Sequence, residues 1–182
     1  MTASIASRLR RNLLRLALFA GAFALGGSLS PSAEVAVTCD RFASTSGTTA
    51  NYPTGGTSGN PWTLTKLLQT LDAGQTGCLG AGTYSAGSAF SNLKTGTSDA
   101  ARVTVTTKPG DARATVSVPN IYIPAGKNFI TLENLKIVGT GPAVTLQLYG
   151  DNLTLRNNEV TNNHNGESCI LISDTRAPSP VG

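Results

Sequence analysis

The chain has 182 residues, of which 40% are hydrophobic, 13% charged and 5% aromatic, with 20 glycines. This composition excludes an intrinsically disordered chain, and its many Gly, Ser and Thr residues favour strands and turns over helices. The net charge of +4 comes from four arginines among the first fifteen residues, so it does not indicate a nucleic-acid partner.

Residues 1–36 have the pattern of a secretory signal peptide. A basic stretch ends at Arg15, the apolar run LALFAGAFAL covers 16–25, and small residues follow. The apolar run has ten residues, about half of what a bilayer-spanning helix needs, so we expect no stable membrane anchor after cleavage. The adjacent Arg10 and Arg11 also fit a twin-arginine signal, although an ordinary Sec signal is the favoured interpretation. The protein is therefore expected to be secreted or extracellular.

The three cysteines are Cys39, Cys78 and Cys169. Exported proteins oxidise paired thiols, and a disulfide between Cys39 and Cys78 would tie the first mature residues to the first strand. Cys169 is left over, and its apolar neighbours at 170–172 predict a buried, inert thiol. With a single His and no C-x-x-C motif, the sequence has no zinc-site spacing.

Residues 37–60 are rich in Ser, Thr and Gly, and we interpret them as an irregular lead-in. A short amphipathic helix is predicted over 63–72, capped by Thr63 and ended by Gly74. Its apolar residues follow helical spacing: Leu64, Leu67, Leu68 and Leu71.

After the helix the chain reads as short strands separated by turns, and it contains a repeat. ITLENLKIVG covers 130–139 and LTLRNNEVTN covers 153–162, a spacing of 23 residues. Such a period is typical of solenoids, in which one turn buries its apolar face only by stacking on the next. Tight hairpin signals and helices between the strands are missing from the pattern, which argues against a β-sandwich and an α/β fold. The sequence predicts an all-β, right-handed parallel β-helix over 61–174, with the helix as its N-terminal cap.

If the two repeats are stacked turns, the residues at which they differ can be explained. Opposite charges on adjacent rungs attract mildly, and Asn suits a left-handed corner where stacked amides share hydrogen bonds. Three pairs are expected to form this structural ladder: Glu133 over Arg156, Lys136 over Glu159, and Asn134 over Asn157.

Four segments carry a resemblance to a known family: TLTKLLQTLDAGQTGCLGAGTY, ARVTVTTKPGDARATV, FITLENLKIVG and NLTLRNNEVTNN. They resemble the cap helix, first strand and following coils of secreted right-handed parallel β-helix proteins of the pectate-lyase-like superfamily, over about residues 39–173. That superfamily contains polysaccharide lyases, glycoside hydrolases and proteins without established activity. The resemblance implies a carbohydrate-facing groove and, for a lyase, calcium held by clustered acids.

The sequence offers three candidate sites, and each of them also has a purely structural interpretation. The charged ladder could be catalytic, or it could be inter-coil ion pairs. Asp151, Glu167 and Asp174 could bind calcium, or they could be ordinary turn acids. His164 could be a general base, or a solvated turn residue.

Three of the four tyrosines form a further candidate. Tyr84, Tyr122 and Tyr149 could make a sugar-stacking strip, or Tyr84 could pack under the cap while the others are single exposed aromatics. The sequence identifies no catalytic residue, no acidic cluster and no cofactor, and calcium is implied by the resemblance alone.

The repeat is lost after Ile172, and we interpret 175–182 as an unstructured tail. Roughly three coils without a terminal cap suggest a truncated N-terminal portion of a longer β-helix protein. We expect a secreted, carbohydrate-associated β-helix monomer, with a non-catalytic polysaccharide-binding or structural protein as the alternative. If it is an enzyme, it is a polysaccharide lyase or glycoside hydrolase, but the chain looks too short for a complete site.

Overall fold

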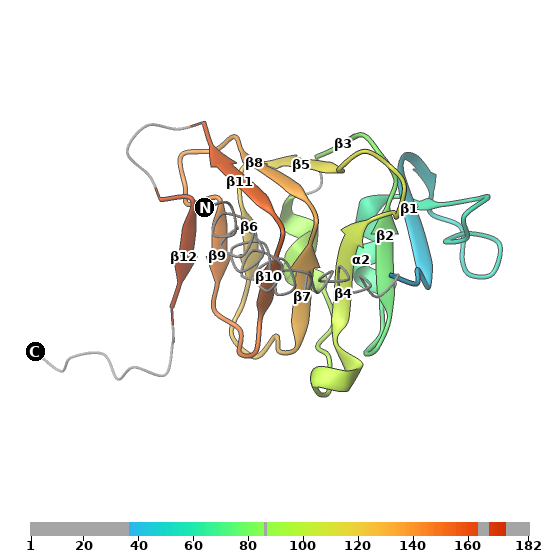
Figure 1. Cartoon of the computed structure of the whole chain (residues 1–182), viewed down its shortest axis with the longest axis horizontal. Helices are drawn as coiled ribbons and strands as arrows, with labels where there is room; N and C mark the ends of the chain where they lie inside the picture. Colours follow the sequence, from blue (N-terminus) through green and yellow to red (C-terminus); the bar gives the residue numbers. More distant parts are fainter. Residues whose placement is uncertain (1–36, 86, 164–167, 174–182) are drawn as a thin grey trace, which may run out of the picture. The chain divides into compact units, whose positions relative to one another are not determined.

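The computed structural model describes residues 37–85, 87–163 and 168–173 (Figure 1). The predicted signal peptide 1–36 and the tail 175–182 lie outside the described residues. The same is true of three candidate site residues: His164, Glu167 and Asp174.

The strands form three parallel sheets that wind into a β-solenoid of about four turns, which confirms the predicted fold class (Figure 1). Sheet A contains β1 (Arg41–Thr48), β2 (Thr76–Leu79), β4 (Val103–Thr107), β7 (Ile130–Glu133) and β10 (Thr154–Arg156). Sheet B contains β3 (Thr83–Tyr84), β5 (Thr115–Val118), β8 (Lys136–Gly139) and β11 (Glu159–Asn162). Sheet C contains β6 (Ile121–Ile123), β9 (Leu146–Leu148) and β12 (Ile170–Ile172).

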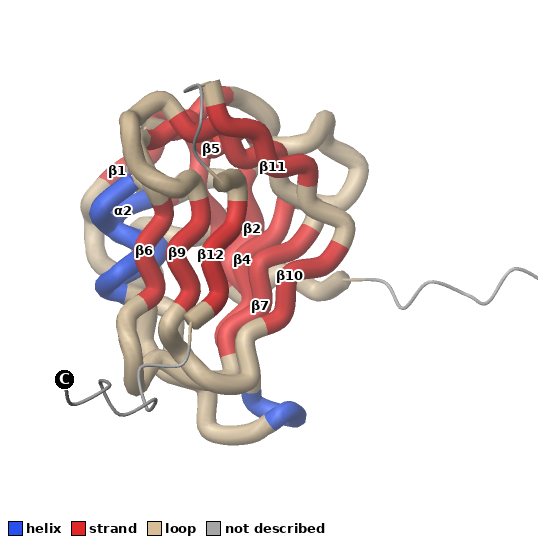
Figure 2. Tube along the Cα trace, turned by 90° about the vertical axis from the view of Figure 1, so that its left-hand side faces the viewer, coloured by secondary structure: helices blue, strands red, loops and turns tan. Residues whose placement is uncertain are grey.

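The core runs through the middle of this winding, and Figure 2 shows the three sheets as separate stacks around it. Inward side chains stack in columns because strands in parallel register present the same face at every turn. Leu132 pairs with Leu155, and Ile137 pairs with Val160. The 23-residue repeat therefore predicts the register of the last two turns correctly.

The N-terminal end of the solenoid is capped by the helix α2 (Leu64–Thr70), slightly shorter than the predicted 63–72. Thr63 is its N-cap and accepts a hydrogen bond from the backbone N–H of Lys66. The helix lies so close to β2 that a Cβ built at Gly77 would stand 2.7 Å from Leu71 Cδ1. Glycine at this inward position lets the cap seal the first turn.

Among the described residues of the first complete turn, none forms a strand of sheet C. The 3₁₀ helix η1 (Gly87–Asn92) packs between α2 and β6 instead, and it buries Phe90 in the core. A second 3₁₀ turn, η2 (Asp99–Ala101), leads into β4. The cap and η1 together cover the core where sheet C has not yet begun.

The interpretation of 37–60 as irregular is wrong for residues 41–48, which form β1 and pair in parallel with β2. The Ser- and Thr-rich sequence RFASTSGT lacks a long apolar alternation, so pattern alone does not reveal a strand. It becomes one because β2 offers an open edge and the predicted disulfide, now confirmed between Cys39 and Cys78, holds it there with a Cα–Cα distance of 5.7 Å.

Cys169 is exposed, so the prediction of a buried thiol is wrong. The three residues of β12 that follow it are exposed as well. Among the described residues, β12 is the outermost strand of sheet C and pairs only with β9. Its apolar sequence is therefore not enough to bury it against the described part of the chain.

Candidate functional site

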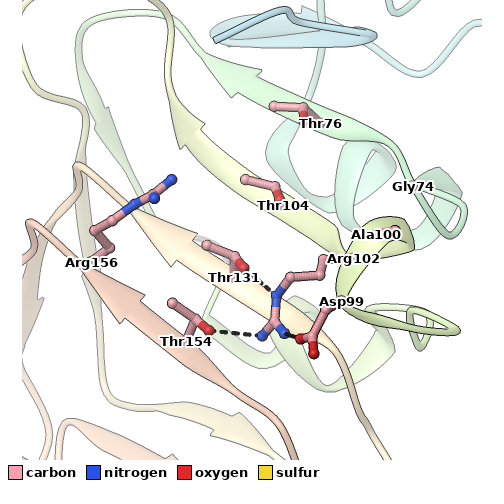
Figure 3. Close-up of a pocket in the computed structure, with 9 residues that line it drawn as sticks. All are labelled: Gly74, Thr76, Asp99, Ala100, Arg102, Thr104, Thr131, Thr154 and Arg156. Carbon is pink, nitrogen blue, oxygen red and sulfur yellow. Dashed lines mark hydrogen bonds and ion pairs between the residues drawn. The ribbon is translucent and has the colours of Figure 1, made fainter. Parts of the chain in front are cut away.

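The outer face of sheet A carries a column of threonines, one on each of four neighbouring strands (Figure 3). The parallel register aligns them in one row: Thr76, Thr104, Thr131 and Thr154. Neighbouring rungs of a sheet are about 4.8 Å apart, so the hydroxyls recur at that interval. The alternating residues on the same strands, such as Val105 and Leu132, point into the core.

Arg102 crosses this column and joins three successive turns. Its Nε donates to Thr131 Oγ1 at 2.8 Å, and its Nη2 donates to Thr154 Oγ1 at 2.8 Å. The same Nη2 also donates to two backbone carbonyls, Ile130 O at 3.0 Å and Asn152 O. The side chain is only 17% exposed. Arg102 is thus a structural residue of the outer face, and sequence reasoning missed it.

A shallow groove of about 460 Å³ follows the threonine column. Gly74, Asp99 and Ala100 line one end of it, and Arg156 lies at the other side of the column (Figure 3). Asp99 Oδ1 accepts a hydrogen bond from Arg102 Nη1 at 2.7 Å, and the carboxylate side chain is 86% exposed. Thr131 is buried, and its hydroxyl and that of Thr154 accept hydrogen bonds from Arg102. The groove therefore presents chiefly the Thr76 and Thr104 hydroxyls along its floor and the Arg156 guanidinium at its side.

The charged ladder is split between two sheets. Arg156 Nη2 lies 2.7 Å from Glu133 Oε2 on sheet A, and Lys136 Nζ lies 2.9 Å from Glu159 Oε1 on sheet B. These are the pairs that the repeat predicts. They do not form one patch of acids and bases, because the corner of the solenoid separates them.

That corner is built by the two predicted asparagines. Asn134 and Asn157 have φ angles of 53° and 51°, in the left-handed region that Asn tolerates better than most residues. Asn157 Nδ2 donates to Asn134 Oδ1 at 3.2 Å. The stacked amides hold adjacent corners together, and the left-handed backbone at each corner turns the chain from sheet A to sheet B.

The three candidate tyrosines do not form a strip. Tyr84 is buried, and its hydroxyl lies 2.8 Å from Gly80 O and 3.2 Å from Ala43 O. Burial, with a smaller effect from the nearby carboxylate of Asp111, raises the pKa of Tyr84 to about 12. Tyr122 and Tyr149 do form a pair, with ring centroids 5.6 Å apart and planes tilted by 60°.

Of the three predicted calcium ligands, the structure describes Asp151, while Glu167 and Asp174 lie outside the described residues, so the predicted set stays a prediction. Asp151 lines a second cavity near β10 and β12. Within the same described ranges, no group of three or more His, Cys, Asp or Glu side chains is arranged to hold a metal ion.

Two further observations bear on the protein as a whole. The disulfide is consistent with an extracellular protein, and none of the helices in the described ranges is long and apolar enough to span a bilayer. Comparison with protein-family models, with curated proteins and with solved structures gives no match to this chain.

Proposed function

We propose that this is a secreted protein that binds an extracellular uronate-rich polysaccharide in the groove on sheet A. The observation that carries the proposal is the row of threonine hydroxyls with Arg156 beside it. The Thr76 and Thr104 hydroxyls can donate and accept hydrogen bonds, while the Thr131 and Thr154 hydroxyls already accept from Arg102 and keep a proton to donate. The row repeats at a constant interval. Such a row suits a ligand that is itself a repeat of hydroxylated units.

Arg156 supplies the preference for acidic sugars. Its side chain is 66% exposed and points from the last described rung of sheet A beside the threonine column. A guanidinium recognises carboxylates through charge-assisted and often bidentate hydrogen bonds. Because the Glu133 carboxylate holds Arg156 from one side, the guanidinium is oriented before a ligand arrives.

The expected signal peptide and the resemblance to pectate-lyase-like β-helix proteins also support a carbohydrate ligand outside the cell. Cleavage of the glycan by a lyase or hydrolase mechanism is the second function to test. Glycoside hydrolysis generally uses two carboxylates, whereas the groove lining contains one, Asp99, which is paired with Arg102. Binding is therefore the function that this lining supports best.

The proposal is tested by affinity electrophoresis and calorimetry with polygalacturonate, alginate and neutral dextran. We expect binding to the two uronate polymers and weakening by Arg156→Gln of about tenfold, which corresponds to about 1.4 kcal/mol. Lys136→Gln is the matched control, since it removes the cation of the ion pair on sheet B. Thr104→Val and its sheet B counterpart Thr115→Val test the hydroxyl row in the same way.

The same samples should be examined for unsaturated products and new reducing ends, with and without calcium. Release of either would establish cleavage in place of simple binding. If the groove variants and the sheet B variants bind equally well, the groove is not the binding site. Loss of binding in Tyr122→Ala instead would place the glycan on the Tyr122–Tyr149 pair of sheet C.

A further inference from the structure

The two walls of the groove on sheet A carry opposite charges. Asp99 lies in η2, just before β4 begins, whereas Arg156 is the last residue of β10. Figure 3 shows the two side chains on opposite sides of the threonine column. A ligand that lies on the column therefore has a carboxylate beside one of its edges and a guanidinium beside the other.

The wall formed by Asp99 is acidic towards an incoming ligand, although Asp99 is paired with Arg102. The Asp99 side chain is 86% exposed, whereas the Arg102 side chain is only 17% exposed. The Arg102 guanidinium also donates hydrogen bonds to Thr131, Thr154 and two backbone carbonyls. A sugar carboxylate that approaches this wall comes first to Asp99, and the two like charges repel.

The wall formed by Arg156 has the reverse order of exposure. The Arg156 side chain is 66% exposed, whereas that of its partner Glu133 is only 14% exposed. A sugar carboxylate that approaches from this side comes first to the guanidinium, which attracts it. The groove therefore has one wall that favours a carboxylate and one wall that disfavours it.

The direction of the threonine column decides which carboxylates reach which wall. Its interval of about 4.8 Å is comparable with the length of one sugar unit, so an extended glycan can lie along the column with its edges towards the walls. Successive units of an extended β-linked glycan turn their substituents to opposite sides. A homopolymer of uronates therefore directs every second carboxylate towards Asp99. A glycan in which uronates alternate with uncharged sugars directs all its carboxylates towards Arg156.

We propose that the groove takes such an alternating glycan and that Asp99 is the residue that discriminates against polyuronates. The inference rests on the proposed function and adds the class of glycan to it. An uncharged sugar suits the acidic wall, because the exposed carboxylate of Asp99 can accept hydrogen bonds from a hydroxyl or an amide N–H of the sugar. The uronate then lies with its carboxylate at Arg156.

Calorimetric titration of the full chain at low ionic strength tests the preference with two hexasaccharides. One is β-1,4-linked polyglucuronate, and the other is hyaluronan, in which glucuronate alternates with N-acetylglucosamine. We expect the wild type to bind the hyaluronan hexasaccharide about threefold more tightly, which is the order of effect that one exposed charge contact produces. The comparison is stringent, because a groove that responded only to total charge would prefer polyglucuronate.

Asp99→Asn removes the negative charge from the acidic wall and keeps an oxygen that can accept from Arg102. We expect its affinity for polyglucuronate to rise about threefold and the gap to hyaluronan to close. Because the expected change is a gain, partial unfolding of the variant would not produce it. Asp111→Asn is the matched control, since Asp111 also pairs with a basic residue three positions away, Lys108, but does not line the groove.

Equal or tighter binding of polyglucuronate by the wild type would overturn the inference, and so would an equal gain for both hexasaccharides in Asp99→Asn. If both bind equally well and Arg156→Gln weakens both, the glycan-binding function stands and only the preference for alternation is refuted. If neither binds, or if Arg156→Gln weakens neither, the proposed function fails and this inference fails with it.

Discussion

Replacing Arg102 by methionine should destabilise the solenoid strongly for a residue on an outer face. Methionine keeps the apolar stem of the side chain but removes the guanidinium. Arg102 immediately precedes β4, and its guanidinium donates hydrogen bonds to acceptors on the two following turns of the solenoid. Its loss therefore weakens contacts between turns while leaving the core composition unchanged.

The magnitude follows from the number of hydrogen bonds. The acceptors on the following turns are Thr131 Oγ1, Ile130 O, Thr154 Oγ1 and Asn152 O. Nε has one hydrogen and Nη2 has two, so these four acceptors share three N–H groups. A net contribution of about 1 kcal/mol for each N–H group gives about 3 kcal/mol, and regained side-chain entropy offsets roughly 1 kcal/mol. The exposed ion pair with Asp99 adds little. We expect the free energy of unfolding to fall by about 2 kcal/mol and Tm by about 6 °C.

Urea unfolding followed by far-UV circular dichroism measures this change. A double-mutant cycle of Arg102→Met with Thr154→Val should give a coupling energy of about 1 kcal/mol, because the two side chains share a hydrogen bond. The cycle with Thr104→Val is the control, since the hydrogen bonds of the guanidinium run to the later turns. A loss below about 1 kcal/mol, or equal coupling in both cycles, would refute the idea that Arg102 joins the turns.

Three further predictions concern other contacts. The folded-state pKa of Tyr84 is about 12, above its ordinary value of 10.0, so its contribution to stability is complete below pH 10 and is lost as the pH rises from about 10 to 12. The gap in Tm between wild type and Tyr84→Phe should accordingly narrow over that range in thermal scans. Glu133→Lys should lower the free energy of unfolding by a few tenths to about 1 kcal/mol, and adding Arg156→Glu should recover it; a double variant no better than the single one would disprove the assigned pairing. Removing the disulfide by Cys39→Ser with Cys78→Ser should cost about 4 kcal/mol in urea unfolding, from loop entropy over a sequence separation of 39 residues.

The register of the later turns could be predicted because it depends on residue type at a fixed interval. Inward positions must be apolar and the corner must accept a left-handed backbone, so Leu132 and Asn134 each predict their counterpart one turn later. Opposite charges then follow from the pairing. These constraints are local to each residue, and they are visible in one sequence.

The features that sequence reasoning missed depend on contacts with groups that no pattern of residue types reveals. Arg102 binds two backbone carbonyls and two threonines that look like ordinary strand residues. The strand β1 forms against an edge supplied by β2, far along the chain. The exposure of Cys169 depends on whether another layer covers β12, which its apolar neighbours do not reveal.

The equivalent asparagine corners allow this solenoid to be shortened by one whole turn. Asn134 and Asn157 are equivalent corners separated by 23 residues, so excising 134–156 would join Glu133 to Asn157 and keep every column in phase. Deleting one residue within a strand would instead move apolar side chains from the core to the surface. Whole turns are therefore units in which such a chain can grow or shrink during evolution, and a second copy of 134–156 would add one threonine to the row.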